Sequence, residues 1–265
     1  MNWADDVTVG SFDGRSLRAR IGPAWNALQG VNGGMVAAIA VEAGAMALEA
    51  AGADPAGTPL RAATFGYVNG TVAGEIDVDV DVVRRGRGLI TSHVRVVQDG
   101  RTTMVGRLHH AATRDGVAFH HGPDRPDRPA GTVPLRGDGA AHFDRVETWL
   151  HPGTPLFGGI DRAEWTAWSR PLHGGGFDTT WLTMFGDYLP PAVFARSTGP
   201  SRAVTVEYAI QIHLGTDRWA LDDGTYLATR VHAFHAHDGF AVEDGTIWLP
   251  DGTLLATTRQ TRLAG

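Results

Sequence analysis

The chain has 265 residues, of which 43% are apolar and 20% charged, and its formal net charge is −6. This composition predicts a soluble protein of one large domain or two small ones. The absence of cysteine and lysine excludes disulfides, thiolate zinc sites, a cysteine nucleophile and Schiff-base chemistry. The acidic balance argues against a nucleic-acid partner, since such proteins usually carry a concentrated basic face.

The sequence predicts no membrane segment and no signal peptide. The most apolar run, residues 35–51, contains two glutamates, and no run is expected to span a membrane. Residues 1–6 are acidic and lack the basic start of a signal peptide. We therefore expect a cytoplasmic protein, and the abundance of Ala, Gly, Asp and Arg is typical of a GC-rich bacterial genome.

The first half of the chain predicts one helix followed by antiparallel strands. Asn32 is placed to cap a helix over residues 33–49, whose alanines and glycines leave one side thin enough for a sheet to wrap closely. Residues 76–82 alternate strictly between apolar and polar, as a half-buried strand does. Two further strands, joined by an Asp-Gly hairpin turn, are expected at residues 90–97 and 102–109.

Residues 114–144 predict a linker, because four prolines and scattered glycines leave little apolar period. The linker separates an N-terminal domain, residues 1–113, from a C-terminal domain, residues 145–265. In the second domain, Asp178 is placed to cap a helix that runs from residue 179 towards 189. Strands are expected at residues 203–214, 226–237, 239–249 and 254–263, with an Asp-Gly turn at 251–252.

The two halves share an order of elements and some sequence. The segment 61–67 (RAATFGY) parallels 202–208 (RAVTVEY), which makes Thr64 the internal counterpart of Thr205. A helix followed by an antiparallel meander, twice over, lacks the strand–helix alternation of a parallel sheet. We therefore predict an α+β fold in which, in each half, a curved antiparallel sheet wraps around a long helix.

Several common catalytic motifs do not occur. No Gly-x-Ser-x-Gly elbow supports a serine nucleophile, and there is no phosphate loop or dinucleotide fingerprint. His232, His235 and His237 are close in sequence, but spacing supplies no further ligand for a metal. We interpret them as exposed or hydrogen-bonded strand histidines and predict no metal and no other cofactor.

Three residues carry chemistry whose role the sequence alone leaves open. Asp187 lies in an otherwise apolar helical stretch, where it is either a buried carboxylate or a solvent-facing one. Strand alternation places Thr205 on the same face as Glu207, and this face is either exposed to solvent or part of a lined cleft. Gln260 lies on the expected final strand, where an exposed glutamine is the usual case.

Five segments, taken in order, point to a known family. They are Gly30-Val31-Asn32-Gly33-Gly34, Val83-Arg84-Arg85-Gly86-Arg87-Gly88, Gly186-Asp187-Tyr188, Val204-Thr205-Val206-Glu207, and the Asp251-Gly252 turn leading to Gln260. Together they resemble the TesB-like acyl-CoA thioesterase II family, over most of the chain except the part before Trp25 and the linker. The resemblance implies a double hotdog, with two hotdog domains in tandem, and a catalytic trio that falls on Asp187, Thr205 and Gln260.

The resemblance also implies a reaction. An acyl-CoA or acyl-carrier-protein thioester would be hydrolysed, in lipid metabolism, by a water that Asp187 activates and that Thr205 and Gln260 help to orient. The helix start at Gly33 and Gly34 is the candidate site for the developing oxyanion or the CoA phosphates. A monomer or a homo-oligomer is expected, since a fused pair already supplies the pairing of two hotdogs.

Comparison of the halves predicts one catalytic site, and two rival functions stay open. Aligning the two Asp-Gly turns puts Leu108 opposite Gln260, and the first helix holds no aspartate. An enoyl-CoA hydratase or dehydratase of the hotdog type is one rival, although no histidine follows Asp187 as that chemistry requires. A non-catalytic acyl-thioester-binding protein is the other rival.

Overall fold

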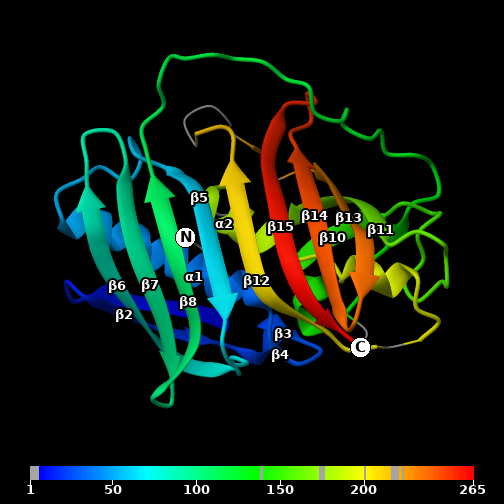
Figure 1. Cartoon of the computed structure of the whole chain (residues 1–265), viewed down its shortest axis with the longest axis horizontal. Coiled ribbons are helices and arrows are strands. Elements are labelled where there is room, and N and C mark those ends of the chain that lie inside the picture. Colours follow the sequence, from blue (N-terminus) through cyan, green and yellow to red (C-terminus); the bar gives the residue numbers. More distant parts are fainter. Residues whose placement is uncertain (1–5, 138–139, 173–176, 200, 216–220, 223) are drawn as a thin grey trace.

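The computed structural model describes residues 6–137, 140–172, 177–199, 201–215, 221–222 and 224–265. Within this part of the chain, thirteen antiparallel strands form one sheet in the order β1-β2-β6-β7-β8-β5-β12-β15-β14-β13-β11-β10-β9. Both α-helices lie behind the sheet in Figure 1, on the same face. The predicted α+β class, with an antiparallel sheet packed on helices, is confirmed.

One side of the sheet comes from residues 7–110. Its strands, in sheet order, are β1 (Val7–Phe12), β2 (Ser16–Ile21), β6 (Gly74–Arg85), β7 (Ile90–Gln98), β8 (Arg101–His110) and β5 (Leu60–Tyr67). The strands predicted at 76–82, 90–97 and 102–109 are confirmed within β6, β7 and β8. The sequence did not predict β1 and β2, because an alternation over six residues carries little signal.

The other side of the sheet comes from residues 133–264. Its strands, in sheet order, are β12 (Ala203–Ile212), β15 (Leu254–Ala264), β14 (Phe240–Trp248), β13 (Leu227–His237), β11 (Glu164–Pro171), β10 (Val146–Leu150) and β9 (Val133–Pro134). The four predicted strands are confirmed to within two residues at each end, and the short strands β9 to β11 were missed. A separate two-stranded sheet joins β3 (Asn26–Ala27) to β4 (Gly30–Val31).

The two sides of the sheet meet where β5 pairs with β12. The pairing is antiparallel and sets Gly66 opposite Glu207. The two segments of similar sequence, 61–67 and 202–208, therefore lie on neighbouring strands in the middle of the sheet (Figure 1). One continuous sheet consequently runs through both halves of the chain.

Helix α1 (Gly33–Ala50) is a core helix. The side chain of Asn32 caps it by accepting a hydrogen bond from the main-chain nitrogen of Met35 at 3.1 Å, as predicted. By length and composition α1 could cross a membrane, which corrects the expectation that no run reaches that length. However, 67% of it is buried inside the protein, as in the core helix of a globular fold.

Helix α2 (Thr179–Phe185) is shorter than predicted. Asp178 caps it by accepting hydrogen bonds of 2.9 Å from the main-chain nitrogens of Thr180 and Trp181. The helix ends at Phe185 with Gly186 as its C-cap, before the expected limit of residue 189, and Leu189 is itself disfavoured in the helical conformation because it precedes Pro190. Among the elements that the structure describes in full are three 3₁₀ turns, at Pro23–Trp25, Ala141–Arg145 and Ala192–Ala195.

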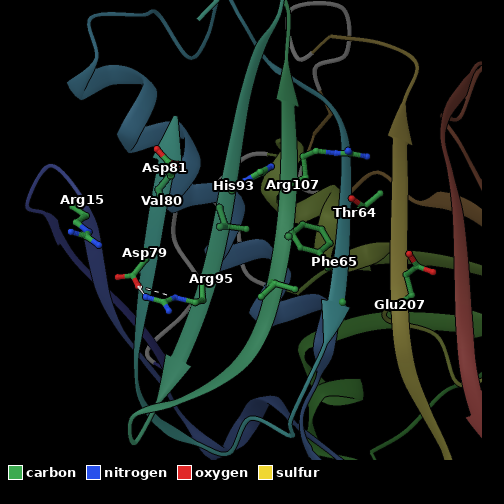
Figure 2. A pocket seen from close by; sticks show the side chains of 14 residues that line it. Arg15, Thr64, Phe65, Asp79, Val80, Asp81, His93, Arg95, Arg107 and Glu207 are labelled. Atoms are coloured by element: carbon green, nitrogen blue, oxygen red, sulfur yellow. Dashed lines mark hydrogen bonds and ion pairs between the residues drawn. The ribbon is translucent and has the colours of Figure 1, made fainter. Parts of the chain in front are cut away.

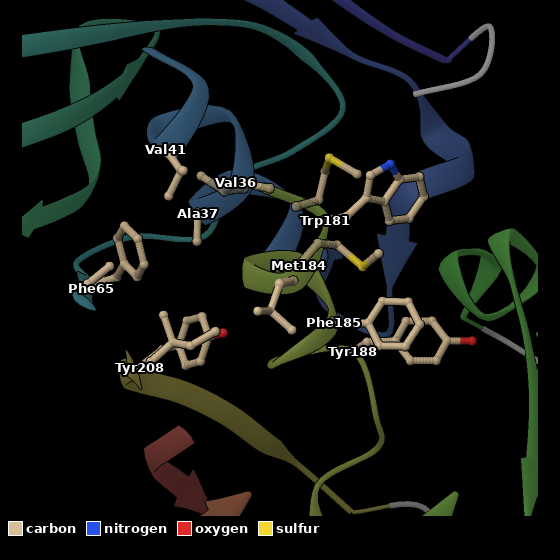
Figure 3. Packing of buried hydrophobic residues seen from close by; sticks show 14 of the residues in the cluster. Val36, Ala37, Val41, Phe65, Trp181, Met184, Phe185, Tyr188 and Tyr208 are labelled. Atoms are coloured by element: carbon tan, nitrogen blue, oxygen red, sulfur yellow. The ribbon is translucent and has the colours of Figure 1, made fainter. Parts of the chain in front are cut away.

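The hydrophobic core is shared by both helices and the central strands. Figure 3 shows this packing, in which side chains of α1, of α2 and of the residues just after α2 meet those of β5 and β12. Its labelled members are Val36, Ala37, Val41, Phe65, Trp181, Met184, Phe185, Tyr188 and Tyr208. Because one core joins elements from both halves, the end of α2 is held firmly against the start of α1.

Residues 111–132 form neither helix nor strand, and β9 follows them within the predicted linker. They run from the end of β8 past the ends of the central strands to the side of the sheet that holds β10 and β11 (Figure 1). The indole nitrogen of Trp248 donates a hydrogen bond to the carbonyl oxygen of Pro123 at 3.2 Å, which attaches this segment to β14. The division into residues 1–113, 114–144 and 145–265 stays a prediction.

Candidate active site

The candidate site forms where the C-terminal end of α2 meets the N-terminal end of α1. The side-chain nitrogen of Asn32 donates a hydrogen bond to the carbonyl oxygen of Asp187 at 3.0 Å. A Cβ atom on Gly34 would lie 2.6 Å from the carbonyl oxygen of Met184, so only glycine permits this approach. The two helix ends therefore place Asp187 beside the first turn of α1.

A β-bulge in β12 turns Thr205 towards the helices. Thr205 pairs with Arg262 of β15, but Glu207 pairs with Thr261, which leaves Val206 as an extra residue in the strand. Thr205 consequently contacts Asp187, whereas Glu207 is exposed on the outer face. The expectation that Thr205 and Glu207 share a face is wrong, because strict alternation takes no account of a bulge.

The structure brings together the three residues that the resemblance assigned to catalysis. The hydroxyl of Thr205 lies 3.3 Å from Asp187 Oδ1 and 3.1 Å from Gln260 Oε1. Gln260 Nε2 donates a hydrogen bond to the carbonyl oxygen of Gly186 at 3.2 Å, which fixes the amide against the end of α2. Asp187 and Gln260 are both buried, so the solvent-facing alternatives for these two residues are wrong.

A buried ion pair behind the trio was not predicted. Arg262 donates a hydrogen bond to the Thr205 hydroxyl at 2.8 Å, and its guanidinium lies 3.4 Å from Asp187 Oδ1. Glu243 of β14 accepts from the same guanidinium and from the main-chain nitrogen of Ala192, beyond the end of α2. Arg262 lies two residues after Gln260, so strand alternation alone would have placed both on one face.

Burial sets the protonation of Asp187. It raises the pKa of the carboxyl from its ordinary 3.8 to about 6. The positive charge of Arg262 and the hydrogen bonds from Thr205 and Gln260 lower this pKa, while the negative charge of Glu243 raises it. The carboxylate is thus ionised above about pH 6 and retains enough basicity to accept a proton near neutral pH.

A cavity of about 490 Å³ opens beside Asp187 and Thr205. Apolar side chains from both halves line much of it, namely Val31, Val36, Phe143, Leu156, Phe157, Leu189 and Phe194. Gly33 lies on its wall, and so do two exposed arginines, Arg136 and Arg202. Gly34 packs instead against α2, so of the two glycines assigned to substrate binding it is Gly33 that borders the cavity.

Sequence comparison identifies the family. Residues 21–111 match the acyl-CoA thioesterase N-terminal domain family, and residues 119–264 match the acyl-CoA thioesterase C-terminal domain family. The chain belongs to the acyl-CoA thioesterase family. The protein is therefore a thioester hydrolase, as the resemblance implied. A search of curated proteins found no match to this thioesterase.

Solved structures show the fold of the thioesterase. A hot dog fold protein of unknown function from Alicyclobacillus acidocaldarius superposes with a TM-score of 0.84 at 20% identity, over 97% of this chain and 96% of that chain. The acyl-CoA thioesterase II TesB2 from Mycobacterium marinum gives a TM-score of 0.74 at 17% identity, over 97% and 94%. A tesB protein from Mycobacterium avium subspecies paratuberculosis gives 0.74 at 15% identity, over 97% and 95%. These likenesses establish a hotdog fold.

A wider hollow of about 720 Å³ lies on the outer face of the thioesterase sheet, away from the helices (Figure 2). Its lining includes charged side chains of both signs, and one ion pair there joins Arg95 to Asp79 at 2.6 Å. Thr64, the internal counterpart of Thr205, lines this hollow and not the cavity beside Asp187. The register also pairs Leu108 with Ala63, whereas Gln260 pairs with Tyr208, so Leu108 and Gln260 are not equivalent positions.

The strand histidines of the thioesterase lie on β13, two strands away from Gln260, and they do not line the cavity beside Asp187. The rings of His235 and His237 stack with their centroids 6.0 Å apart, on one face as predicted, and both residues are exposed. Among the described residues, no group of three or more His, Asp or Glu side chains is arranged to hold a metal ion. These histidines have no part in the candidate site.

Proposed function

We propose that this thioesterase hydrolyses an acyl-CoA to a free acid and CoA, with Asp187 as the base that activates water. The observation that carries the proposal is a buried carboxylate, held by Thr205 and Arg262 through one oxygen, on the wall of an apolar cavity. The other oxygen, Asp187 Oδ2, faces Gly33 at the start of α1. An acyl chain suits the apolar cavity, and Arg136 and Arg202 suit the CoA phosphates.

The first step is the addition of water to the thioester carbonyl. Asp187 accepts a proton from the water while the water oxygen bonds to the carbonyl carbon, and the π electrons move to the carbonyl oxygen. Thr205 and Gln260 hold the carboxylate and the water in line for this attack. Because Arg262 donates to the Thr205 hydroxyl oxygen, the hydroxyl proton is directed towards Asp187 or Gln260.

The second step breaks the carbon–sulfur bond. The tetrahedral intermediate re-forms its carbonyl and expels the thiolate, and Asp187 returns the proton to the sulfur. The main-chain amide of Gly33, in the first turn of α1, supports the negative charge on the oxyanion. The carboxylate ends the cycle as it began, and no covalent intermediate forms.

We further propose that the sheet consists of two hotdog domains in tandem, which meet at the β5–β12 pair. The supporting observations are the helix-then-strands order in both halves, the adjacent positions of the matching segments, and the separate N- and C-terminal family matches. We expect the protein to act in the cytoplasm, with an acyl-carrier-protein thioester as the alternative substrate.

The test is thiol release from acyl-CoAs of graded chain length, by wild type and by Asp187→Asn. We expect Asp187→Asn to lower kcat by about 10²- to 10⁴-fold and to keep the fold, because asparagine has the same shape but cannot accept the proton. Asp244→Asn is the matched control, since Asp244 pairs with Arg259 on the outer face and should retain wild-type turnover.

Three outcomes would overturn the proposal. Near wild-type turnover by Asp187→Asn would remove the base from the mechanism. Consumption of an enoyl-CoA without thiol release would identify a hydratase. Tight binding of acyl-CoA with no chemistry over hours would identify a binding protein.

A further inference from the structure

Tyr67 contributes a side chain from the N-terminal half to the wall of the candidate site. It is the last residue of β5 and lines the same cavity as Asp187 and Thr205. A Cβ atom on Gly33 would lie 3.0 Å from the Tyr67 hydroxyl and 2.8 Å from Asp187 Oδ2. The hydroxyl and the free carboxylate oxygen therefore border the same space over the first residue of α1.

The hydroxyl of Tyr67 differs from those of its buried neighbours. It is shielded from solvent and has no hydrogen-bond partner among the described residues. The hydroxyl of Tyr208, by contrast, donates to the carbonyl oxygen of Thr183 at 2.8 Å. A buried hydroxyl without a partner opposes folding, and on the wall of a cavity it is available to donate a hydrogen bond to a bound ligand.

We propose that Tyr67 is a further catalytic residue, whose hydroxyl donates a hydrogen bond to the carbonyl oxygen of the bound thioester and stabilises the oxyanion. The proposal rests on the thioesterase function argued above. Asp187 Oδ2 accepts a proton from the attacking water, and the Tyr67 hydroxyl donates a hydrogen bond to the carbonyl oxygen. The two groups therefore assist the same addition, one at the nucleophile and the other at the carbonyl. The negative charge that leaves the carbon–oxygen double bond arrives beside a donor already in position.

The electrostatic surroundings keep this donor protonated. Burial, and then the negative charge of Asp187, raise the pKa of the Tyr67 hydroxyl well above its ordinary value of 10.0. The hydroxyl therefore holds its proton near neutral pH, where Asp187 is ionised. It acts as a hydrogen-bond donor and does not transfer its proton.

The inference also explains why one site uses both halves of the chain. The base and its supports come from the turn after α2 and from β12 and β15, whereas the oxyanion donors come from β5 and the start of α1. A rearrangement at the β5–β12 pair would therefore separate Tyr67 from Asp187 even with both halves folded. The junction itself becomes part of the catalytic geometry.

The test compares Tyr67→Phe with wild type by kcat, KM and the pH profile of kcat/KM. We expect kcat to fall about 100-fold, as when one oxyanion donor is removed. KM should change little, because the hydrogen bond strengthens only as charge develops. The acidic midpoint near the Asp187 pKa of about 6 should not move. Tyr208→Phe is the matched control, and it should lower the melting temperature and retain kcat.

A second measurement avoids turnover. An acyl-CoA with a ¹³C-labelled carbonyl is bound to Asp187→Asn and to the Asp187→Asn/Tyr67→Phe double variant, and the carbonyl stretch is recorded by infrared difference spectroscopy. A hydrogen bond from Tyr67 lowers the stretching frequency, so the band should lie higher in the double variant. Equal frequencies would contradict the proposal, even if Tyr67→Phe lowered activity through misfolding.

Two kinetic results would also overturn it. A kcat within twofold of wild type would show that the hydroxyl does nothing in the rate-limiting step. An acidic midpoint displaced to higher pH, with activity recovered above it, would show that the hydroxyl binds Asp187 instead of substrate. If Asp187→Asn is inactive while Tyr67→Phe is fully active, only this inference fails; if wild type releases no thiol, the proposed function fails.

Discussion

Glu243→Gln and Arg262→Met should move the pKa of Asp187 in opposite directions. Arg262 lowers this pKa through its positive charge, and Glu243 raises it through its negative charge. Loss of Arg262 should therefore displace the acidic limb of kcat/KM to higher pH, and neutralisation of Glu243 should displace it to lower pH. A role confined to folding would lower activity in both variants and leave the midpoint in place.

The size of the two displacements follows from the geometry. At the 3.4 Å between Arg262 and Asp187 Oδ1, unit charges in an effective dielectric of about 20 interact by about 5 kcal/mol. Arg262 shares its charge with Glu243, so we expect about 1 to 3 kcal/mol to act on Asp187, or a rise of about one to two pH units. Glu243 acts across the guanidinium, so its loss should lower the midpoint by about half to one pH unit.

The assay is thiol release from pH 4.5 to 9 at a temperature where each variant is folded. Arg262→Met leaves Glu243 buried without its partner and should cost about 3 to 5 kcal/mol of unfolding free energy, so circular dichroism must accompany the kinetics. Arg259→Met is the matched control, because that arginine pairs with Asp244 on the outer face and should leave the midpoint near 6. If the acidic midpoint of kcat/KM moved in the same direction in Glu243→Gln and Arg262→Met, the opposite effects of the two charges on Asp187 would be refuted.

Two further predictions concern stability. Ionisation of the buried Asp187 carboxyl opposes folding, since its pKa is about 6 in the folded protein against an ordinary 3.8. The protonated carboxyl therefore stabilises the fold fully below about pH 4, and this stabilisation is lost as the pH rises through 6. Asp187→Asn removes this loss, and its stability relative to wild type should be greater at pH 8 than at pH 4 by about 3 kcal/mol; equal differences in urea unfolding at the two pH values would contradict this. Gly34→Ala would bring a methyl group to 2.6 Å from the Met184 carbonyl oxygen and should cost about 1 to 3 kcal/mol. Gly116→Ala, with open space around it, is its control, and equal melting temperatures for the two variants would refute the close helix contact.

The sequence by itself determined the local elements of this thioesterase. The caps at Asn32 and Asp178 lie within a few residues of their helices and depend on side chains that bond their own backbone. Alternation located the longer strands, because a half-buried strand needs a period of two. The order of the family segments selected Asp187, Thr205 and Gln260, although in isolation only Asp187 was unusual and its role stayed open.

Only the tertiary structure decided which chemistry these residues can perform. The bulge at Thr205 depends on pairing with β15, so alternation along one strand assigned its face wrongly. The burial that raises the pKa of Asp187 comes from elements far away in sequence, and so does the ion pair of Arg262 with Glu243. Tyr67 lies near Asp187 because the start of α1 packs against the end of α2 and because β5 pairs with β12. Local sequence patterns indicate the backbone conformation that a segment prefers. The protonation state of a side chain depends instead on every charge and surface that folding brings within a few ångströms.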